Sequence, residues 1–292
     1  RVWLVLESGG QAGAILGGFV SALEALGYRD CFDGMVGCSA GAMTAAYFAA
    51  GQAAMGTTIY PEDNCDGRFL SPWRIFSRRP VMDLDYLVDD VMVNRKPLAT
   101  ARLQKEVMPV WAVATERDGT KQLLPLTGVE GERVREHMKL SARVPIWVVR
   151  DVTTGHVWDG GLLEPIPLPS AWECGATHVV WLSRLPKGVV AFPIAASEQW
   201  LVQPWFWWKA PDFVELLRHR RKRMDEILSC FDCVGPEVLR VALEDPLSGI
   251  GTCNRKILWQ DIRQAYRTVE RIFTGNEGRL PWPEAWQGVR PL

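Results

Sequence analysis

The sequence predicts an α/β protein built on a mostly parallel central sheet. Two observations support this prediction. Short apolar runs alternate with helical patterns over the first half of the chain, which is typical of βαβ units with right-handed crossovers. The first two apolar runs each lead through a glycine-containing turn into a helix. After about residue 210 the pattern becomes helical, and we interpret this part as an extension of the same core.

The first elements are the most regular. A strand is expected over Val2–Leu6, an apolar run compatible with burial on both faces of a sheet. A helix over Ala14–Leu26 follows, because its apolar residues recur on one face and Gly27 suits its C-terminal cap. A strand over Phe32–Val36 and a helix over Ala42–Ala50 then repeat the arrangement.

The later elements are less regular, and we expect a single domain over residues 1–292, with a core over 1–190 and a helical extension over 191–292. A loop is expected over Tyr60–Gly67. The remaining expected strands are Val110–Thr115, Lys121–Pro125, Ile146–Val149 and Val179–Ser183. The remaining expected helices are Met82–Met92, Glu132–Leu140, Phe213–Cys230, Glu237–Ala242 and Trp259–Phe273.

Composition argues against several classes of protein. The 292 residues carry a net charge of −1, without the basic surplus of most nucleic-acid-binding proteins. The seven cysteines are odd in number and scattered, which favours a reducing compartment over a disulfide framework. No apolar run reaches the roughly 18 residues of a membrane span, and the N-terminus lacks a signal-peptide pattern. We therefore expect a cytoplasmic protein, and from the start at Arg1 we expect that the natural N-terminus has been trimmed.

A candidate nucleophile lies in the segment Gly37-Cys38-Ser39-Ala40-Gly41, between a predicted strand and a helix of small residues. Glycines two positions on either side of a serine permit a tight strand-to-helix turn that exposes the hydroxyl. A serine in this place can also serve merely as a helix N-cap. Ser39 is therefore a candidate nucleophile only if the chain also supplies a base and an anion-stabilising loop.

A second glycine turn, containing Gly9 and Gly10, follows the first predicted strand. Because neighbouring parallel strands end side by side, this loop is expected to face Ser39 and to offer N–H groups to an oxyanion. A dinucleotide phosphate cradle is the alternative. That alternative fits poorly, since G-x-G-x-x-G requires a glycine at position 8, where Ser8 stands, and no acidic residue follows at the expected distance.

The residues alone leave the identity of the base open. None of the four histidines lies in a motif that positions a catalytic base: His137, His156, His178 and His219. A triad in the order Ser–Asp–His can still be built from Ser39, Asp159 and either of the last two. Asp159 precedes two glycines at the end of a predicted strand, where an Asp-Gly hairpin turn is the plain structural alternative.

Three motifs in this order resemble the patatin-like phospholipase family, in its bacterial branch. They are ESGGQAG (residues 7–13), VGCSAGA (36–42) and DGGLLEPIP (159–167). Weaker similarities lie at residues 81–87, 114–115 and 140–145. The resemblance covers roughly residues 2–190 and extends more loosely to about residue 275.

The resemblance implies a three-layer patatin-like fold and a metal-independent serine hydrolase of lipid acyl esters, of the phospholipase A type. Ser39 would be the nucleophile and Asp159 the general base, a dyad in place of a triad. The further site residues implied are Gly9, Gly10 and Gln11 in the oxyanion hole, Gly37 and Gly41 at the nucleophile elbow, and Gly160 and Gly161 in the turn of the base. No cofactor is expected, and the expected partner is a lipid or other acyl-ester substrate.

Two departures from the family pattern concern the glycine loop. Ser8 stands where the family has its first glycine, and Ala12 where it has a basic residue. Because an aspartate with a pKa of about 3.9 is a weak base at neutral pH, activity requires a desolvated site or strong oxyanion stabilisation. Ser8 and Ala12 motivate the alternative function, a lipid-associating or scaffolding protein with a weakened site.

The last third of the chain contains two features that suggest lipid contact. Four tryptophans are expected to pack over the sheet or against a partner subunit, with peripheral contact with a membrane surface as the alternative: Trp200, Trp205, Trp207 and Trp208. The basic run at residues 218–223 is either a solvated helix face or a contact for anionic lipid. Cys230 and Cys233 have zinc-like spacing but lack a second pair, so no metal site is expected there.

Overall fold

The structure is a computed structural model that describes residues 1–77, 79–145, 147–148, 156–187, 189, 211, 215 and 237–287. Its described part contains one seven-stranded sheet of order β4-β3-β2-β1-β6-β7, in which β5 pairs with β3 outside this path. The parallel strands are β1 (Val2–Leu6), β2 (Gly34–Cys38), β3 (Val110–Glu116), β6 (His178–Ser183) and β7 (Glu237–Ala242). The strands antiparallel to β3 are β4 (Lys121–Pro125) and β5 (Val157–Asp159).

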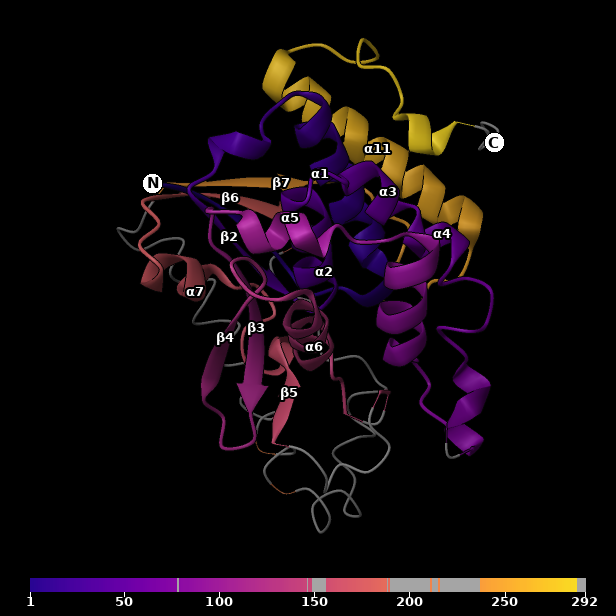
Figure 1. The fold of residues 1–292 in the computed structure, drawn as a ribbon. Helices are drawn as coiled ribbons and strands as arrows, with labels where there is room; N and C mark the ends of the chain where they lie inside the picture. The colour runs from indigo at the N-terminus through magenta and orange to yellow at the C-terminus, as the bar shows by residue number, and fades with distance from the viewer. Residues whose placement is uncertain are drawn as a thin grey trace.

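Helices cover both faces of this sheet, which confirms the predicted α/β class (Figure 1). The longer ones are α1 (Gly13–Ala25), α2 (Ala40–Ala49), the π-helix η4 (Tyr86–Arg95), α6 (Gly131–Ser141) and α11 (Arg255–Thr274). The shorter α-helices are α3 (Ala53–Thr57), α4 (Ile59–Glu62), α5 (Thr100–Lys105) and α7 (Leu168–Glu173). The 3₁₀ helices are η1 (Gly10–Ala12), η2 (Arg29–Cys31), η3 (Pro72–Phe76), η5 (Gly160–Leu162) and η6 (Glu284–Trp286).

The alternation of side chains along β1 explains the three layers. Leu4 and Leu6 join a core that contains buried residues of α1, α2 and α11. Trp3 and Val5 point to the other face, where they share a smaller core with α7. Because both faces of the central strands are buried, an uninterrupted apolar run is what such a strand requires.

Helix α11 ties the C-terminal segment to the core, and Figure 1 shows it lying along α1. Asn254 caps its first turn by accepting hydrogen bonds from the N–H groups of Lys256 and Ile257. Gly275 ends the helix in the left-handed conformation, at a φ of 69°. The predicted helix over Trp259–Phe273 is confirmed and begins four residues earlier.

One of the predicted helices is a strand in the structure. Glu237–Ala242 was expected to be a helix, but it is the strand β7, which pairs in parallel with β6. Its Glu, Leu, Arg and Ala residues favour a helix locally, whereas the edge of β6 offers a full ladder of hydrogen bonds, so tertiary pairing overrides propensity. Arg240 strengthens this pairing by stacking its guanidinium 4.5 Å from the ring centroid of Trp181.

Smaller differences concern boundaries and short helices. The predicted strand Phe32–Val36 is shifted by two residues, to β2. The expected loop at Tyr60–Gly67 begins inside α4, and the helix expected at Met82–Met92 is the π-helix η4. Trp147 and Val148 lie in a turn, so the described part of the predicted strand Ile146–Val149 is not a strand.

Several predictions fall on residues outside the described part of the chain and stay predictions. They concern Trp200, Trp205, Trp207 and Trp208, the basic run at 218–223, His219, Cys230, Cys233 and most of the helix expected at 213–230. Within the described ranges, no helix combines the length and the apolar character needed to cross a membrane.

Candidate active site

Ser39 occupies a strained corner between β2 and α2. Its φ of 54° and ψ of −118° make it the only non-glycine residue with positive φ in the described part of the chain. Its N–H donates to the Oγ of Ser141 at 3.0 Å, and that hydroxyl donates to the carbonyl of Val113 at 2.6 Å. A buried chain of hydrogen bonds therefore holds a conformation that costs about 1–3 kcal/mol.

Two glycines permit this corner because no side chain fits at either position. A Cβ on Gly41 would lie 2.4 Å from the carbonyl oxygen of Leu6, at the end of β1. A Cβ on Gly37 would lie 2.6 Å from the backbone of Ala42, in the first turn of α2. The elbow is thus pressed against the end of β1, where the glycine loop begins.

Strand register brings Asp159 to the elbow. Strand β3 pairs with β4 along one edge, over Trp111–Thr115. Two strands pair in succession with the other edge of β3. The strand β2 ends with Cys38 opposite Val113, and β5 pairs with the next residues of β3, with Asp159 opposite Ala114. The residue that follows β2 and the residue that ends β5 therefore meet along one edge of β3.

Asp159 is buried, and its turn fixes it by several hydrogen bonds. Its Oδ1 accepts from the N–H of Gly161 at 2.6 Å, and its own N–H donates to the carbonyl of Arg143 at 3.1 Å. The hydroxyl of Thr115 donates to the Asp159 carbonyl at 3.0 Å. The carboxylate is thus held in one orientation, with 6% of the residue exposed to solvent.

The glycine loop lies against both motifs. A Cβ on Gly161 would lie 3.2 Å from the hydroxyl of Ser8, so the loop touches the turn of Asp159. Gly10 has a φ of 53°, in the region that favours glycine. The N–H of Gln11 donates to the carbonyl of Ile250 at 2.9 Å. Gln11 was predicted to donate to an oxyanion, and this bond already engages its N–H group.

Arg184, which follows β6, extends to the glycine loop. Its Nε donates to the carbonyl of Ser8 at 2.6 Å, and its backbone N–H donates to Glu7 Oε1 at the same distance. Its Cδ would lie 2.6 Å from a Cβ on Gly9. Burial raises the pKa of Glu7, while the Arg184 guanidinium opposes that rise. A cation therefore lies beside the loop although Ala12 has no charge.

The C-terminal segment forms one wall of the site. The carboxylate of Asp261, buried on α11, accepts from the N–H groups of Leu247 and Ser248. These bonds fix the turn that presents Ile250 to the glycine loop. Residues far apart in the sequence thus shape the same site.

The three motifs open into one cavity of about 350 Å³. Ser8, Gly9, Gly10, Ser39, Asp159, Gly161 and Arg184 line it at one end. The cavity extends past Tyr47, eight residues along α2 and so about 12 Å from Ser39. Many of the other lining side chains are apolar, among them Met43, Ile59, Phe69, Met82, Leu84, Leu87, Met92 and Trp147.

Two hydroxyl groups in the cavity wall, those of Thr44 and Tyr60, are bonded to each other. Thr44 and Tyr60 share a hydrogen bond of 3.1 Å, and the Thr44 hydroxyl donates to the Ala40 carbonyl at 2.9 Å. Burial raises the pKa of Tyr60 to about 12, so this phenol stays protonated at neutral pH. It cannot serve as a base there.

No histidine lines the cavity among the described residues. His178 pairs with Val2 at the start of β1, so about 16 Å of sheet separates it from the edge where Ser39 follows β2. His137 bonds to the Pro125 carbonyl, and His156 is exposed before β5. Within the described ranges, no group of three or more His, Cys, Asp or Glu side chains is placed to hold a metal ion.

A family model, described as patatin-like phospholipase, matches residues 4–172. The chain belongs to this family. The match spans more than half of the chain and includes the glycine loop, the elbow and the Asp159 turn. The family is one of lipolytic acyl hydrolases, so the site belongs to a fold used for that chemistry.

Other comparisons are more distant. The crystal structure of VipD from Legionella pneumophila matches with a TM-score of 0.42 at 11% identity, over 94% of this chain. The chain spans 66% of VipD, less than two thirds of that protein. No curated protein matches the sequence.

Sequence reasoning did not assign roles to Arg184, Ser141 or Ile250. Arg184 directly follows a buried parallel strand, which is a signal for a residue at the ligand-binding edge of a sheet. Ser141 lies within the weak similarity at residues 140–145, and Ile250 within the C-terminal one. Their contacts depend on tertiary packing that a linear pattern does not contain.

Proposed function

We propose that this protein is a serine hydrolase of lipid acyl esters, with Ser39 as nucleophile and Asp159 as general base. The observation that carries the proposal is the strained backbone of Ser39. It lies at an elbow that opens into the cavity lined by Asp159 and the glycine loop. Strain of this kind persists where the surrounding structure enforces it, and it is frequent at nucleophiles.

In the proposed reaction the Ser39 hydroxyl oxygen attacks the carbonyl carbon of the ester, and Asp159 accepts its proton. The tetrahedral intermediate then breaks the bond to the alcohol, which leaves with that proton. Water, deprotonated by the same carboxylate, cleaves the acyl-serine and restores both side chains. Ser39 also occupies the N-cap position of α2, where the N-terminal end of the helix favours negative charge.

The N–H groups of Gly9 and Gly10 are the proposed oxyanion donors. In a trans peptide the C=O and N–H groups point in opposite directions. The Ser8 carbonyl is held by Arg184, and the Gly9 carbonyl accepts from the N–H of Ala12 at 3.1 Å. Both peptides are therefore fixed, and no protein acceptor within the described ranges engages either N–H group. Gln11 is left out of the proposed hole.

The apolar length of the cavity supports an acyl chain as the group that it binds. We expect kcat/KM to rise along a series of nitrophenyl esters from acetate to octanoate, by roughly fourfold per buried methylene. Initial rates below the solubility limit of each ester provide the measurement. Rates that stay flat or fall along the series would contradict an acyl-binding cavity.

Arg184 is proposed as a positioning residue for the oxyanion loop. Arg184→Met should lower kcat by roughly 10- to 100-fold with little change in KM, since the orientation of Gly9 matters most in the transition state. Arg184→Lys, which can still donate to the Ser8 carbonyl, should restore part of kcat. The matched control is Glu7→Gln, which removes the neighbouring charge and keeps the arginine. A change in KM alone, or an equal loss in Glu7→Gln, would contradict this role.

A lipid-associating protein with a weakened site is the second candidate, because Ala12 replaces the basic residue of the family pattern. The position of Arg184 beside Gly9 argues against this candidate, because the arginine supplies positive charge to the glycine loop. The ester series separates the two functions. Turnover at the buffer rate for every ester would favour the second candidate.

A further inference from the structure

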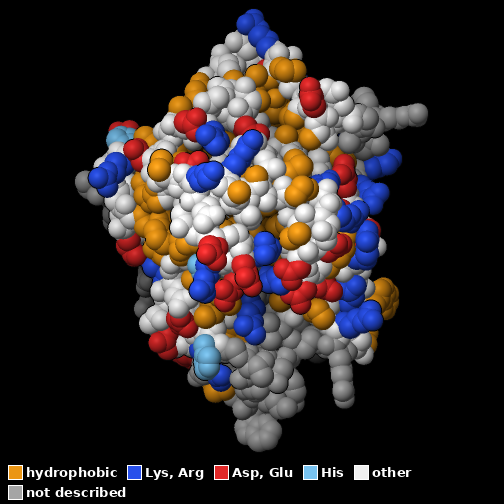
Figure 2. Space-filling model, in the orientation of Figure 1, with side chains coloured by type: hydrophobic (Ala, Val, Ile, Leu, Met, Phe, Trp, Pro, Cys, Tyr) orange, Lys and Arg blue, Asp and Glu red, His pale blue; other side chains and the backbone are white. Residues whose placement is uncertain are grey.

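The loop at residues 67–82, called here the aromatic loop, exposes large apolar side chains to solvent. Trp73 and Phe76, both on η3, are 80% and 86% exposed. Large aromatic side chains normally gain free energy by leaving water, so two of them this exposed on one short helix mark a contact surface. In Figure 2 hydrophobic and Lys or Arg side chains lie side by side at the lower right edge, where η3 lies in Figure 1.

The charge of the aromatic loop has one sign. Residues 67–82 contain four arginines and neither aspartate nor glutamate. Arg68 is paired with Asp66 at 2.6 Å. Arg74 donates to the carbonyls of Gly67 and Arg68, and Arg79 is exposed. Within the described ranges no carboxylate pairs with either of these last two.

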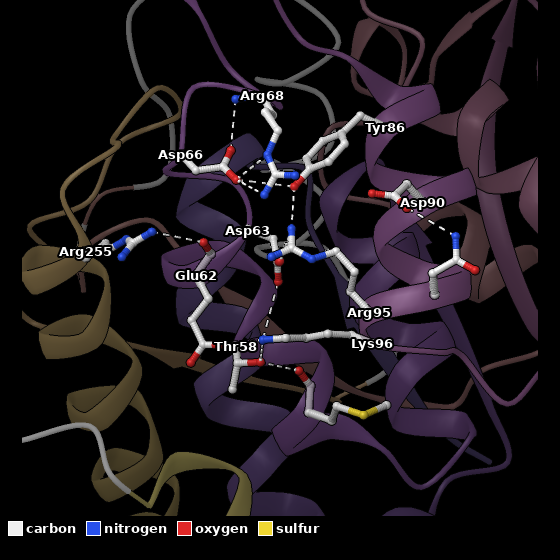
Figure 3. Close-up of polar contacts among 12 residues, drawn as sticks. Thr58, Glu62, Asp63, Asp66, Arg68, Tyr86, Asp90, Arg95, Lys96 and Arg255 are labelled. Carbon is white, nitrogen blue, oxygen red and sulfur yellow. Dashed lines mark hydrogen bonds and ion pairs between the residues drawn. The ribbon is translucent and has the colours of Figure 1, made fainter.

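The neighbouring cations differ in this respect, as Figure 3 shows. Arg95 pairs with Asp63 at 2.7 Å, and Lys96 contacts both Asp63 and Glu62. These contacts connect η4 to α4 beneath the aromatic loop. Among the described cations of the aromatic loop, Arg79 is therefore the one that is both exposed and without a carboxylate partner.

The root of the aromatic loop belongs to the cavity wall. The Ser71 N–H donates to the Val81 carbonyl, and the Asp83 N–H donates to the Phe69 carbonyl, each at 2.9 Å. Leu70 and Met82 form an antiparallel bridge between these bonds. Phe69 and Met82 line the same cavity as Ser39. A ligand that binds Trp73 and Phe76, at the exposed end of the loop, is therefore held beside the cavity.

We infer that the aromatic loop docks the protein on an anionic lipid surface. Tryptophan favours the headgroup level of a bilayer, phenylalanine favours its apolar side, and arginines are attracted to anionic lipids. A protein partner would be expected to present acidic side chains, whereas a lipid surface satisfies both the charge and the exposed rings. The inference rests on the proposed function, since docking here brings the acyl chains of a lipid to the cavity.

Vesicle flotation tests the inference, with Ser39→Ala as the background so that binding is measured without hydrolysis. The full chain should bind vesicles of phosphatidylcholine and phosphatidylglycerol, and bind pure phosphatidylcholine more weakly. Trp73→Ser combined with Phe76→Ser should weaken binding by about 10- to 100-fold. Arg79→Glu should weaken it by about fivefold or more, on anionic vesicles only. Val107→Ser and Lys105→Glu, exposed residues of another segment, are the matched controls and should bind like the parent.

Three results would overturn the inference: no binding by the parent, equal binding by the Trp73 and Phe76 variant, or equal losses in the controls. Light scattering of the same samples identifies the other occupant. A dimer that dissociates on loss of Trp73 and Phe76, with vesicle binding intact, would assign the surface to a second copy of the chain. The loop variants made in the chain that keeps Ser39 should hydrolyse a soluble short-chain ester at the parent rate, so a failure of docking and a failure of the hydrolase proposal are distinguishable.

Discussion

Ser39→Ala is expected to reduce the turnover of a soluble nitrophenyl ester by on the order of 10⁴- to 10⁶-fold, the usual cost of removing a nucleophilic serine. The elbow itself should persist, because the Ser39 N–H still donates to Ser141 and both elbow glycines remain. Circular dichroism and thermal unfolding would check that the variant folds like the parent.

The matched control is Thr44→Val, which removes another hydroxyl of the same helix and cavity. Its hydroxyl bonds to Tyr60 and to the Ala40 carbonyl, so it takes no part in the proposed reaction. We expect turnover to fall by less than about tenfold, the cost of a lost hydrogen bond near the site. Comparable losses in Thr44→Val and Ser39→Ala would show that the cavity, and not the nucleophile, had been damaged.

Asp159→Asn is expected to lower kcat by about 10²- to 10⁴-fold, the contribution typical of a general base. Asparagine keeps the shape of the side chain and can still accept from the N–H of Gly161. The charge needed to accept the Ser39 proton is lost. Initial rates across a range of ester concentrations would separate kcat from KM.

Histidine variants distinguish a dyad from a triad. His156→Gln and His178→Gln should each change kcat by less than about threefold, since neither side chain lines the cavity. His219→Gln extends the comparison to a histidine outside the described residues. A loss equal to that of Asp159→Asn in any one of them would replace the dyad by a triad.

The parts of the fold predicted correctly are those determined by local patterns. The apolar run Val2–Leu6 and the helix that follows it are confirmed because burial on both faces leaves a clear signal in the sequence. The elbow at Ser39 was found because two nearby glycines mark a turn that excludes side chains. The Asp159 turn was found through resemblance of motifs, since an Asp-Gly pair alone also fits a plain hairpin.

The parts missed depend on contacts between distant residues. Glu237–Ala242 becomes a strand only because the edge of β6 is available to it. The N–H of Gln11 is engaged by Ile250, which lies more than 200 residues later. The sequence shows that Ala12 lacks the basic side chain of the family pattern. It does not show that Arg184, which follows another strand, places a cation near Gly9.

Covalent labelling by a fluorophosphonate probe tests the central claim most directly. The probe reports nucleophilic attack itself, so it does not depend on the choice of ester. Peptide mass spectrometry should place one adduct on the peptide containing Ser39, and an octanoyl ester should slow its formation by competition. Labelling should vanish in Ser39→Ala and persist in Thr44→Val. An adduct on another residue, or undiminished labelling of Ser39→Ala, would contradict the account.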